Sequence, residues 1–202
     1  MGVLDGKAAG GRAVAVQSDQ ADVSAVPKLF EQAAEPTGSL DIFVCNAALA
    51  TVIPIADVTE AAYDELFATN LRGPFFAIQR AAQVLPDGGR IIAISTLNTA
   101  LPGPTVALYA ASKAGLEQFV KVAAREYGAR GITVNSVSPG ATATEMFHDN
   151  NPPEAQQAVI GMTALARIGE PADIADVVGF LAGPDSRWIT GQNLRATGGL
   201  VL

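Results

Sequence analysis

Short apolar runs alternate with longer segments of mixed apolar and polar residues along most of the chain. The runs predict strands, whereas the mixed segments carry apolar residues at helical spacing. The expected strands are 12–17, 40–45, 90–95, 132–137 and 191–196, and the expected helices are 24–34, 60–84, 106–130 and 171–182. This alternation is typical of a parallel sheet covered by helices on both faces. We therefore expect an α/β protein.

Two segments depart from the simple alternation. Pro74 lies inside the helical stretch 60–84, and a proline removes a backbone hydrogen bond, so we expect it to kink or divide this stretch. The segment from Ala141 to about Arg167 is polar and irregular, with a short helical patch. Such a segment is typical of a lid over a binding site.

The composition indicates which classes of protein and which kinds of binding partner are expected. Of the 202 residues, 49% are apolar and 16% are charged, which favours one domain over residues 1–202 with a sizeable core, and argues against disorder. The net charge is −7 and the basic residues are scattered, so a nucleic-acid partner is not expected. No apolar run reaches about 18 residues, so no membrane span is expected.

Cysteine and histidine are scarce, which limits metal and thiol chemistry. Cys45 is the only cysteine, so no intramolecular disulfide can form, and its place at the end of an apolar run indicates a buried structural thiol. His148 is the only histidine and lies far from Cys45 in the polar segment, so we expect a solvated loop residue and no metal site. The N-terminus has no apolar signal core, and the cytoplasm is the expected compartment.

One pair of residues has the spacing that proton transfer needs. Tyr109 and Lys113 are four residues apart in a helical segment, so they share one face of the helix. A nearby cation favours the phenolate and lowers the pKa of a tyrosine from about 10, which lets it act as a general acid or base. The hydroxyl residue Thr96 lies thirteen positions upstream of Tyr109, at the end of an apolar strand. This grouping points to redox chemistry of carbonyls and alcohols.

Other chemically suggestive residues follow the ends of the predicted strands. In open α/β sheets, ligands bind beyond the carboxyl ends of the strands. The residues at these ends are Asp19, Asn46, Ala47, Ala48, Thr96, Pro139 and Gly140, and Asn70 lies within the second helix.

Together these motifs resemble the short-chain dehydrogenase/reductase family, within it the 3-oxoacyl-acyl-carrier-protein-reductase-like group. The likeness runs from about Gly10 to Leu202. Its motifs are Asp19; Cys45-Asn46-Ala47-Ala48 and Asn70; Thr96 with Tyr109-x-x-x-Lys113; Pro139-Gly140 with Thr142 and Thr144; and Ile189-Thr190-Gly191-Gln192 to Gly198-Gly199. The family implies a Rossmann-like, doubly wound parallel sheet in a single domain.

The resemblance implies a catalytic role for four positions. Tyr109 would be the acid/base, and Lys113 would lower its pKa and hold the nicotinamide ribose. Thr96 would bind the substrate oxygen, and Asn70 would position a water in a proton relay through Lys113. The implied reaction moves a hydride between NADP or NAD and a ketone, an oxoacyl group or a secondary alcohol.

The resemblance also implies where the cofactor would lie. Asp19 would lie near the adenine, and Asn46 and Ala47 near the adjacent ribose. The turn at Pro139 and Gly140, with Thr142 and Thr144, would lie near the nicotinamide amide. Two interpretations stay open for the two threonines, because they can equally cap a helix that follows the turn.

Several positions depart from the family pattern. Thr96 stands where serine is usual, and its extra methyl group narrows the pocket. We prefer Thr96 to its neighbour Ser95, because consecutive strand residues point to opposite faces. Ala48 replaces a glycine, and its Cβ crowds the approach of the backbone to the cofactor.

The largest departure is an absence near the N-terminus. A dinucleotide fold of this family opens with a strand, a glycine-rich turn, a helix and a second strand, and the turn binds the pyrophosphate. The only candidate turn is 6–11, which has no strand before it and no helix after it and is typical of a linker. We expect that roughly 40 to 50 residues are missing between Lys7 and Ala8, either from the protein or from this sequence of it.

Two functions of different classes follow. The first is an NAD(P)-dependent oxidoreductase acting on a small-molecule carbonyl or alcohol. The second is a truncated, catalytically impaired family member that cannot bind a dinucleotide and acts only as an oligomer or binding remnant. The resemblance implies a homotetramer or homodimer built on the helices 60–84 and 106–130 and the C-terminal strand. A serine hydrolase is disfavoured because no Gly-x-Ser-x-Gly elbow is present.

Overall fold

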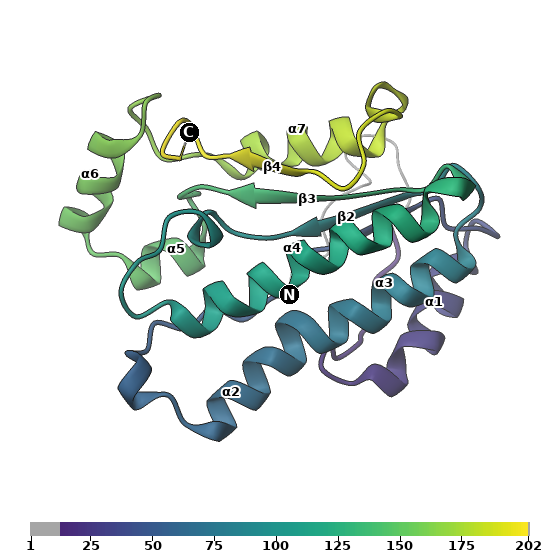
Figure 1. The fold of residues 1–202 in the computed structure, drawn as a ribbon, viewed down its shortest axis with the longest axis horizontal. Helices are drawn as coiled ribbons and strands as arrows, with labels where there is room; N and C mark the ends of the chain where they lie inside the picture. The colour runs from purple at the N-terminus through teal and green to yellow at the C-terminus, as the bar shows by residue number, and fades with distance from the viewer. Residues whose placement is uncertain (1–12, 202) are drawn as a thin grey trace.

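A parallel sheet organises the chain, as the alternation of strands and helices predicted. The structure is a computed structural model that describes residues 13–201. Within these residues, the strands pair in the order β1-β2-β3-β4 and all pairs are parallel (Figure 1). The strands are β1 (Ile42–Cys45), β2 (Arg90–Ile94), β3 (Thr133–Pro139) and β4 (Asn193–Ala196). The glycine-rich segment 6–11 and the junction near residues 7 and 8 lie outside the described residues.

Helices cover both faces of this sheet. Figure 1 shows α3 and α4 on one side of the sheet and α7 on the other. The helices are α1 (Val26–Ala34), α2 (Glu60–Phe67), α3 (Gly73–Val84), α4 (Ala107–Tyr127), α5 (Glu145–Asn150), α6 (Pro153–Met162) and α7 (Pro171–Ala182). This is the α/β, Rossmann-like arrangement expected from the sequence. No helix among residues 13–201 combines the length and the apolar character needed to cross a membrane.

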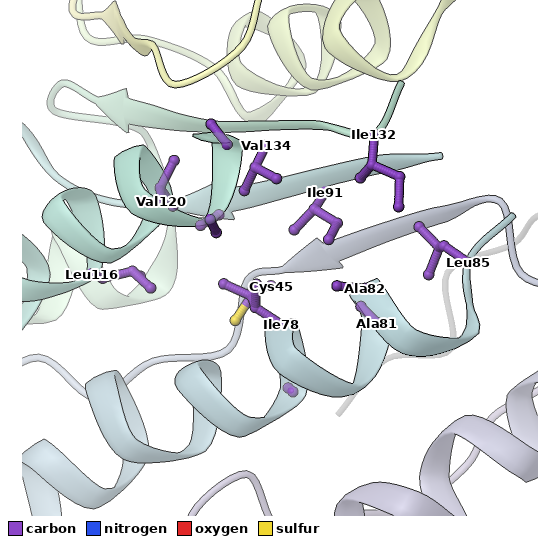
Figure 2. Close-up of a cluster of buried hydrophobic side chains, with 14 of the residues drawn as sticks. Cys45, Ile78, Ala81, Ala82, Leu85, Ile91, Leu116, Val120, Ile132 and Val134 are labelled. Carbon is purple, nitrogen blue, oxygen red and sulfur yellow. The ribbon is translucent and has the colours of Figure 1, made fainter. Parts of the chain in front are cut away.

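Neighbouring residues of β2 bury their side chains on opposite faces of the sheet, because side chains alternate along a strand. Ile91 belongs to the larger core, which lies between the sheet and the helices α3 and α4 (Figure 2). Ile92 belongs to a smaller core under α7, where it packs with Val137 and Leu181. Ile91 and Ile92 are both almost fully buried. Burial on two faces explains why the β2 sequence is an almost continuous apolar run.

The long helical stretch is divided, as Pro74 predicted. α2 ends at Phe67, a π-helical turn spans Ala68–Arg72, and α3 begins at Gly73 with Pro74 in its first turn. Gly73 has a packing reason to be glycine, since a Cβ there would lie 2.0 Å from the carbonyl oxygen of Gln20. A π-helical turn frequently marks a functional position.

The predicted strand 12–17 is wrong for its described part. Residues 13–17 have no regular secondary structure, and the side chain of Val14 is 61% exposed. The apolar pattern gives these residues a preference for the extended conformation, but a strand also needs a neighbour to pair with. Among the described residues the sheet ends at β1, and no strand lies beside 13–17.

The segment 141–167 contains more helix than the sequence predicted. It forms α5 and α6, which lie beyond the carboxyl ends of β2, β3 and β4 (Figure 1). His148 is therefore a residue of a helix and not of a loop, although it is exposed as expected. Thr144 is the N-cap of α5, in agreement with one of the two interpretations of this threonine.

Candidate active site

Three predicted catalytic residues lie where the carboxyl ends of β2 and β3 meet the start of α4. Thr96 follows β2, and Pro139 ends β3. Tyr109 and Lys113 lie in the first two turns of α4, which packs against both strands. The residues predicted from spacing are therefore gathered at one edge of the sheet.

Lys113 is a buried cation in this group. Its side chain is 2% exposed, and its Nζ donates a hydrogen bond to the carbonyl oxygen of Ile94 at 2.8 Å. Burial lowers the pKa of Lys113, because desolvation disfavours the charged form. An ammonium carries three hydrogens, and this is the one hydrogen bond found for it among residues 13–201. Lys113 thus keeps donor capacity that a ligand hydroxyl can use.

Tyr109 is a partly buried phenol that favours its protonated form. Burial raises the pKa of Tyr109, and a hydrogen-bonding influence of Thr96 acts in the opposite direction. Lys113 is not among the groups that shift this pKa, and its ammonium binds Ile94 instead. A lowering of the Tyr109 pKa by Lys113 therefore stays a prediction.

Thr96 and its neighbour Ser95 have hydroxyls in different surroundings. The hydroxyl of Ser95 is occupied, since it donates to Oε1 of Glu117 at 2.5 Å. Thr96 is buried at the end of β2, is close enough to influence Tyr109, and accepts a bond from the backbone N–H of Asn98 at 3.3 Å. Thr96 and Tyr109 therefore form a pair of neighbouring hydroxyls.

Asn70 lies in the π-helical turn, and its side chain is fully buried. Its Oδ1 accepts from the N–H of Leu49, and its Nδ2 donates to the carbonyl oxygen of Leu49, both at 2.8 Å. Nδ2 also donates to the hydroxyl of Ser112 at 3.2 Å, and Ser112 donates to the carbonyl oxygen of Tyr109 at 2.7 Å. The amide thus ties the loop after β1 to the start of α4. The predicted positioning of a water by Asn70 stays a prediction.

The residues expected around the adenosine lie in two adjoining loops. The side chain of Asp19 is exposed and accepts a bond from the N–H of Ala21 at 2.9 Å. Asn46 and Ala47 are exposed and Ala48 is partly buried. These positions are open to a ligand, and their contact with the adenosine stays a prediction.

Gln20 connects these loops and was missed by sequence reasoning. Its Nε2 donates to the carbonyl oxygens of Ala47 and Thr69, each at 2.7 Å. One side chain therefore joins the segment after Asp19, the loop after β1 and the π-helical turn. A lone glutamine in a loop gives no signal in sequence, because its partners are 27 and 49 residues away.

The turn after β3 is held close to the chain that follows β4. The N–H of Gly140 donates to the carbonyl oxygen of Ala196 at 2.9 Å, and a Cβ at Gly140 would lie 2.8 Å from Cα of Thr197. Thr144 caps α5 by accepting from the N–H of Phe147, which confirms one of its two interpretations. Thr142 instead donates to the carbonyl oxygen of Gly140 at 3.0 Å. Contact of either threonine with a cofactor stays a prediction.

Cys45 has the structural place that the sequence predicted. It is 4% exposed, and burial raises the pKa of its thiol to about 11, against a smaller opposing influence of Lys113. Among residues 13–201, no cluster of histidine, cysteine, aspartate or glutamate side chains is suited to a metal ion.

A carboxylate that the sequence analysis passed over, Glu117, also faces this group. It lies one helical turn after Lys113 on α4 and accepts hydrogen bonds from Ser95, Thr99 and Ser138. Its signal in sequence was the i, i+4, i+8 spacing of Tyr109, Lys113 and Glu117, which places all three on one face of a helix.

Comparison with known proteins shows the family. The family described as Enoyl-(Acyl carrier protein) reductase matches residues 4–201. The short chain dehydrogenase claC of Passalora fulva is 38% identical over 206 residues, which cover 96% of this chain and 77% of that protein. The hydroxynaphthalene reductase-like protein Arp2 of Metarhizium brunneum is 40% identical over 205 residues, which cover 95% of this chain and 77% of that protein.

Solved structures agree with the sequence comparisons. A dehydrogenase/reductase from Sinorhizobium meliloti superposes with a TM-score of 0.93 at 42% identity, over 99% of this chain and 79% of that one. The angucycline C-6 ketoreductase LanV with bound NADP superposes with a TM-score of 0.88 at 40% identity, over 96% of this chain and 77% of that one. The chain belongs to the short-chain dehydrogenase/reductase family and is an oxidoreductase of that class.

Proposed function

We propose that the chain transfers a hydride between NADP or NAD and a ketone, an oxoacyl group or the matching secondary alcohol, with Tyr109 as the acid/base. The observation that carries this proposal is the neighbouring hydroxyl pair of Thr96 and Tyr109, with buried Lys113 one helical turn further along α4. A bound nicotinamide supplies or accepts the hydride.

The described residues fit a nicotinamide cofactor at its ribose end. Lys113 is buried, and within residues 13–201 its ammonium donates one hydrogen bond, to Ile94, so its remaining donors suit ribose hydroxyls. Asp19, Asn46 and Ala47 would border the adenosine, and the turn at Gly140 with Thr144 would border the nicotinamide. Relatives solved with bound NADP or NADPH support the same cofactor class.

The two hydroxyls would stabilise the charge that forms during reduction. When a hydride reaches a carbonyl carbon, negative charge develops on the oxygen, and fixed donors favour this state over the ground state. Thr96 would donate a hydrogen bond to the oxygen, and Tyr109 would transfer its proton to it. Because burial raises the pKa of Tyr109, the phenol is protonated near neutral pH, and this state favours reduction over oxidation.

Two relatives have names that support a ketone on an aromatic or polycyclic skeleton as the substrate. These relatives are the hydroxynaphthalene reductase-like protein and the angucycline ketoreductase. The matching family description instead names an acyl-carrier-protein substrate. A direct test offers NADPH or NADH with 2-tetralone in one assay and acetoacetyl-CoA in another, and follows the loss of nicotinamide absorbance. We expect turnover of 2-tetralone; turnover of the thioester alone would move the substrate class to oxoacyl groups.

The second candidate, a remnant that does not bind a dinucleotide, is favoured by a different observation. Among residues 13–201 the segment 13–17 pairs with no strand, and Ile42 and Val44 of β1 are 45% and 40% exposed. These two side chains lie on the face of the sheet that α7 covers over β2, β3 and β4. Calorimetric titrations with NADPH and with NADH separate the two functions, because the remnant would give binding heat with neither. Trp188 is an unsuitable reporter: it is 93% exposed and precedes β4, at the opposite end of that strand from the site.

Three further parts of the proposal rest on the family. We propose that the chain folds as one domain, acts in the cytoplasm and assembles as a homotetramer or homodimer through α2, α3, α4 and the C-terminal strand. Exposed aromatic surface on α3 supports the assembly, because Phe75 and Phe76 are each 39% exposed and Phe75 stacks on Phe119 of α4 at 4.3 Å. Light scattering after size-exclusion chromatography tests it, and a monomeric mass would refute it.

A further inference from the structure

One carboxylate oxygen joins the three segments that form the candidate site. Oε1 of Glu117, on α4, accepts a hydrogen bond from the hydroxyl of Ser95 at 2.5 Å and from that of Thr99 at 2.7 Å. The hydroxyl of Ser138, on β3, lies 3.2 Å from the same oxygen. The partners are 18 to 22 residues away from Glu117, so these bonds are tertiary contacts.

Two of these partners flank the proposed substrate-binding hydroxyl. Ser95 directly precedes Thr96, and Thr99 follows it by three residues. The hydroxyl of Thr99 also lies 3.0 Å from the carbonyl oxygen of Thr96. Glu117 therefore holds both sides of the short segment that carries Thr96.

The hydrogen bonds from Ser95 and Thr99 to Glu117 lie at the point where β2 stops pairing with β3. The N–H of Ser95 donates to the carbonyl oxygen of Val137 at 2.7 Å, after which β2 leaves β3 and the chain enters a 3₁₀ turn at Leu97–Thr99. After Ser95, the segment is held by hydrogen bonds to the side chain of Glu117 and no longer by backbone pairing with β3. Charge-assisted bonds to a carboxylate are stronger than bonds between neutral groups, so they suit this task.

The third partner, Ser138, connects Glu117 to the turn after β3. Ser138 directly precedes Pro139 and Gly140, and its hydroxyl also lies 2.9 Å from Oδ1 of Asn193. A hydroxyl has one hydrogen to donate, so Ser138 shares it between Glu117 and Asn193. Thr99 also faces two acceptors, but its 2.7 Å contact with Glu117 is shorter than the 3.2 Å contact of Ser138.

We infer that Glu117 is a positioning residue, which fixes Thr96 relative to Tyr109 by accepting the hydroxyls of Ser95 and Thr99. The inference rests on the proposed function for its kinetic consequence. Glu117 lies on the same helix face as Tyr109, so one rigid helix carries both the proton donor and the group that holds the second hydroxyl. Rates fall steeply when a reacting group is misplaced by as little as about 1 Å.

The kinetic test compares three variants in the reduction of 2-tetralone by NADPH. Glu117→Ala removes the acceptor, Glu117→Gln keeps an acceptor oxygen without the charge, and Glu126→Ala removes an exposed carboxylate of the same helix as the control. We expect kcat to fall by about 10- to 100-fold in Glu117→Ala with KM for NADPH little changed, while Glu117→Gln recovers most of the rate. Parent-like kcat in Glu117→Ala, or equal losses in the alanine and glutamine variants, would overturn the inference.

Two further measurements keep the test decisive. If Glu117→Ala does not fold, the double variant Ser95→Ala/Thr99→Ala removes the same two bonds and should show the same loss of kcat. Crystal structures of the parent and Glu117→Ala give a readout without turnover, since the separation of the Thr96 and Tyr109 hydroxyl oxygens should change. If the distance between these two hydroxyl oxygens is unchanged in Glu117→Ala, the inference is contradicted, even if neither 2-tetralone nor acetoacetyl-CoA is a substrate. If the distance changes as expected but the parent is inactive, only the proposed function is contradicted.

Discussion

The ammonium of Lys113 lies 2.8 Å from the carbonyl oxygen of Ile94, the last residue of β2, and is almost completely buried. This bond anchors α4 to the strand that leads into Thr96. It also directs the cation to the edge of the sheet where the proposed cofactor ribose would lie. Within the described residues, Lys113 therefore has one structural partner, Ile94, and further N–H donors that a ligand can use.

Tyr109→Phe and Lys113→Ala should separate proton transfer from cofactor binding. The first removes only the hydroxyl that donates the proton, so kcat should fall by at least about 10²-fold while affinity for NADPH stays nearly intact. The second removes the buried cation, so both kcat and NADPH affinity should fall. Steady-state kinetics with 2-tetralone and calorimetric titration with NADPH measure the two effects. Parent-like turnover by Tyr109→Phe would refute the proposed mechanism.

Gly140→Ala should destabilise the protein, because its Cβ would lie 2.8 Å from the backbone of Thr197. A backbone atom cannot move aside as a flexible side chain can, so we expect a loss of about 1–3 kcal/mol in the free energy of unfolding. Gly179→Ala is the matched control, since nothing lies within 4 Å of a Cβ in this interior turn of α7. It should stabilise the protein by about 0.5–1 kcal/mol. Urea unfolding of both variants measures the difference, and equal effects would contradict the packing argument.

The ion pair of Arg167 and Asp173 should contribute to stability only above acidic pH. Arg167 donates to both carboxylate oxygens of Asp173, at 2.7 and 2.8 Å, and this hydrogen bonding lowers the pKa of Asp173 from 3.8 to about 2. A lowered pKa in the folded state gives stability that is present above 3.8 and is lost as the pH falls towards about 2. Both groups are solvent-exposed, so the effect should be small and sensitive to salt.

Thermal unfolding of the parent and Asp173→Asn between neutral and acidic pH tests this dependence. The parent should be more stable near neutral pH, and the difference should shrink as the pH falls below about 4. A difference between the two proteins that does not change with pH would show that the ion pair is not its source.

Cys45 should resist alkylation in the folded protein. The thiolate is the reactive form, and burial both raises the pKa of Cys45 to about 11 and blocks access to it. Iodoacetamide at about pH 8 should therefore leave the native protein largely unmodified and label it fully in urea, where the thiol pKa returns to about 8.5. Intact mass spectrometry distinguishes the two states. Rapid labelling of the native protein would show that the region around β1 opens readily.

The sequence by itself determined the elements whose signals are local. The apolar runs 90–95 and 132–137 became β2 and β3, and Pro74 marked the division between α2 and α3. The helix 171–182 was predicted with the bounds that α7 has. The spacing of Tyr109 and Lys113 placed them on one helix face, because covalent geometry fixes the helical period. These properties depend on neighbouring residues, so they can be read along the chain.

Only the tertiary structure decided which partners the key side chains have. Lys113 donates a hydrogen bond to Ile94, and Glu117 accepts hydrogen bonds from Ser95 and Thr99. Gln20 connects the loop after β1 with the π-helical turn. All of these partners are far apart in sequence. Residues 13–17 have the composition of a strand, but the part of the chain that the structure describes places no strand beside them, so their pattern alone gave a wrong prediction. Pairing and buried hydrogen bonds require groups from distant segments to meet, and packing of the whole domain determines where they meet.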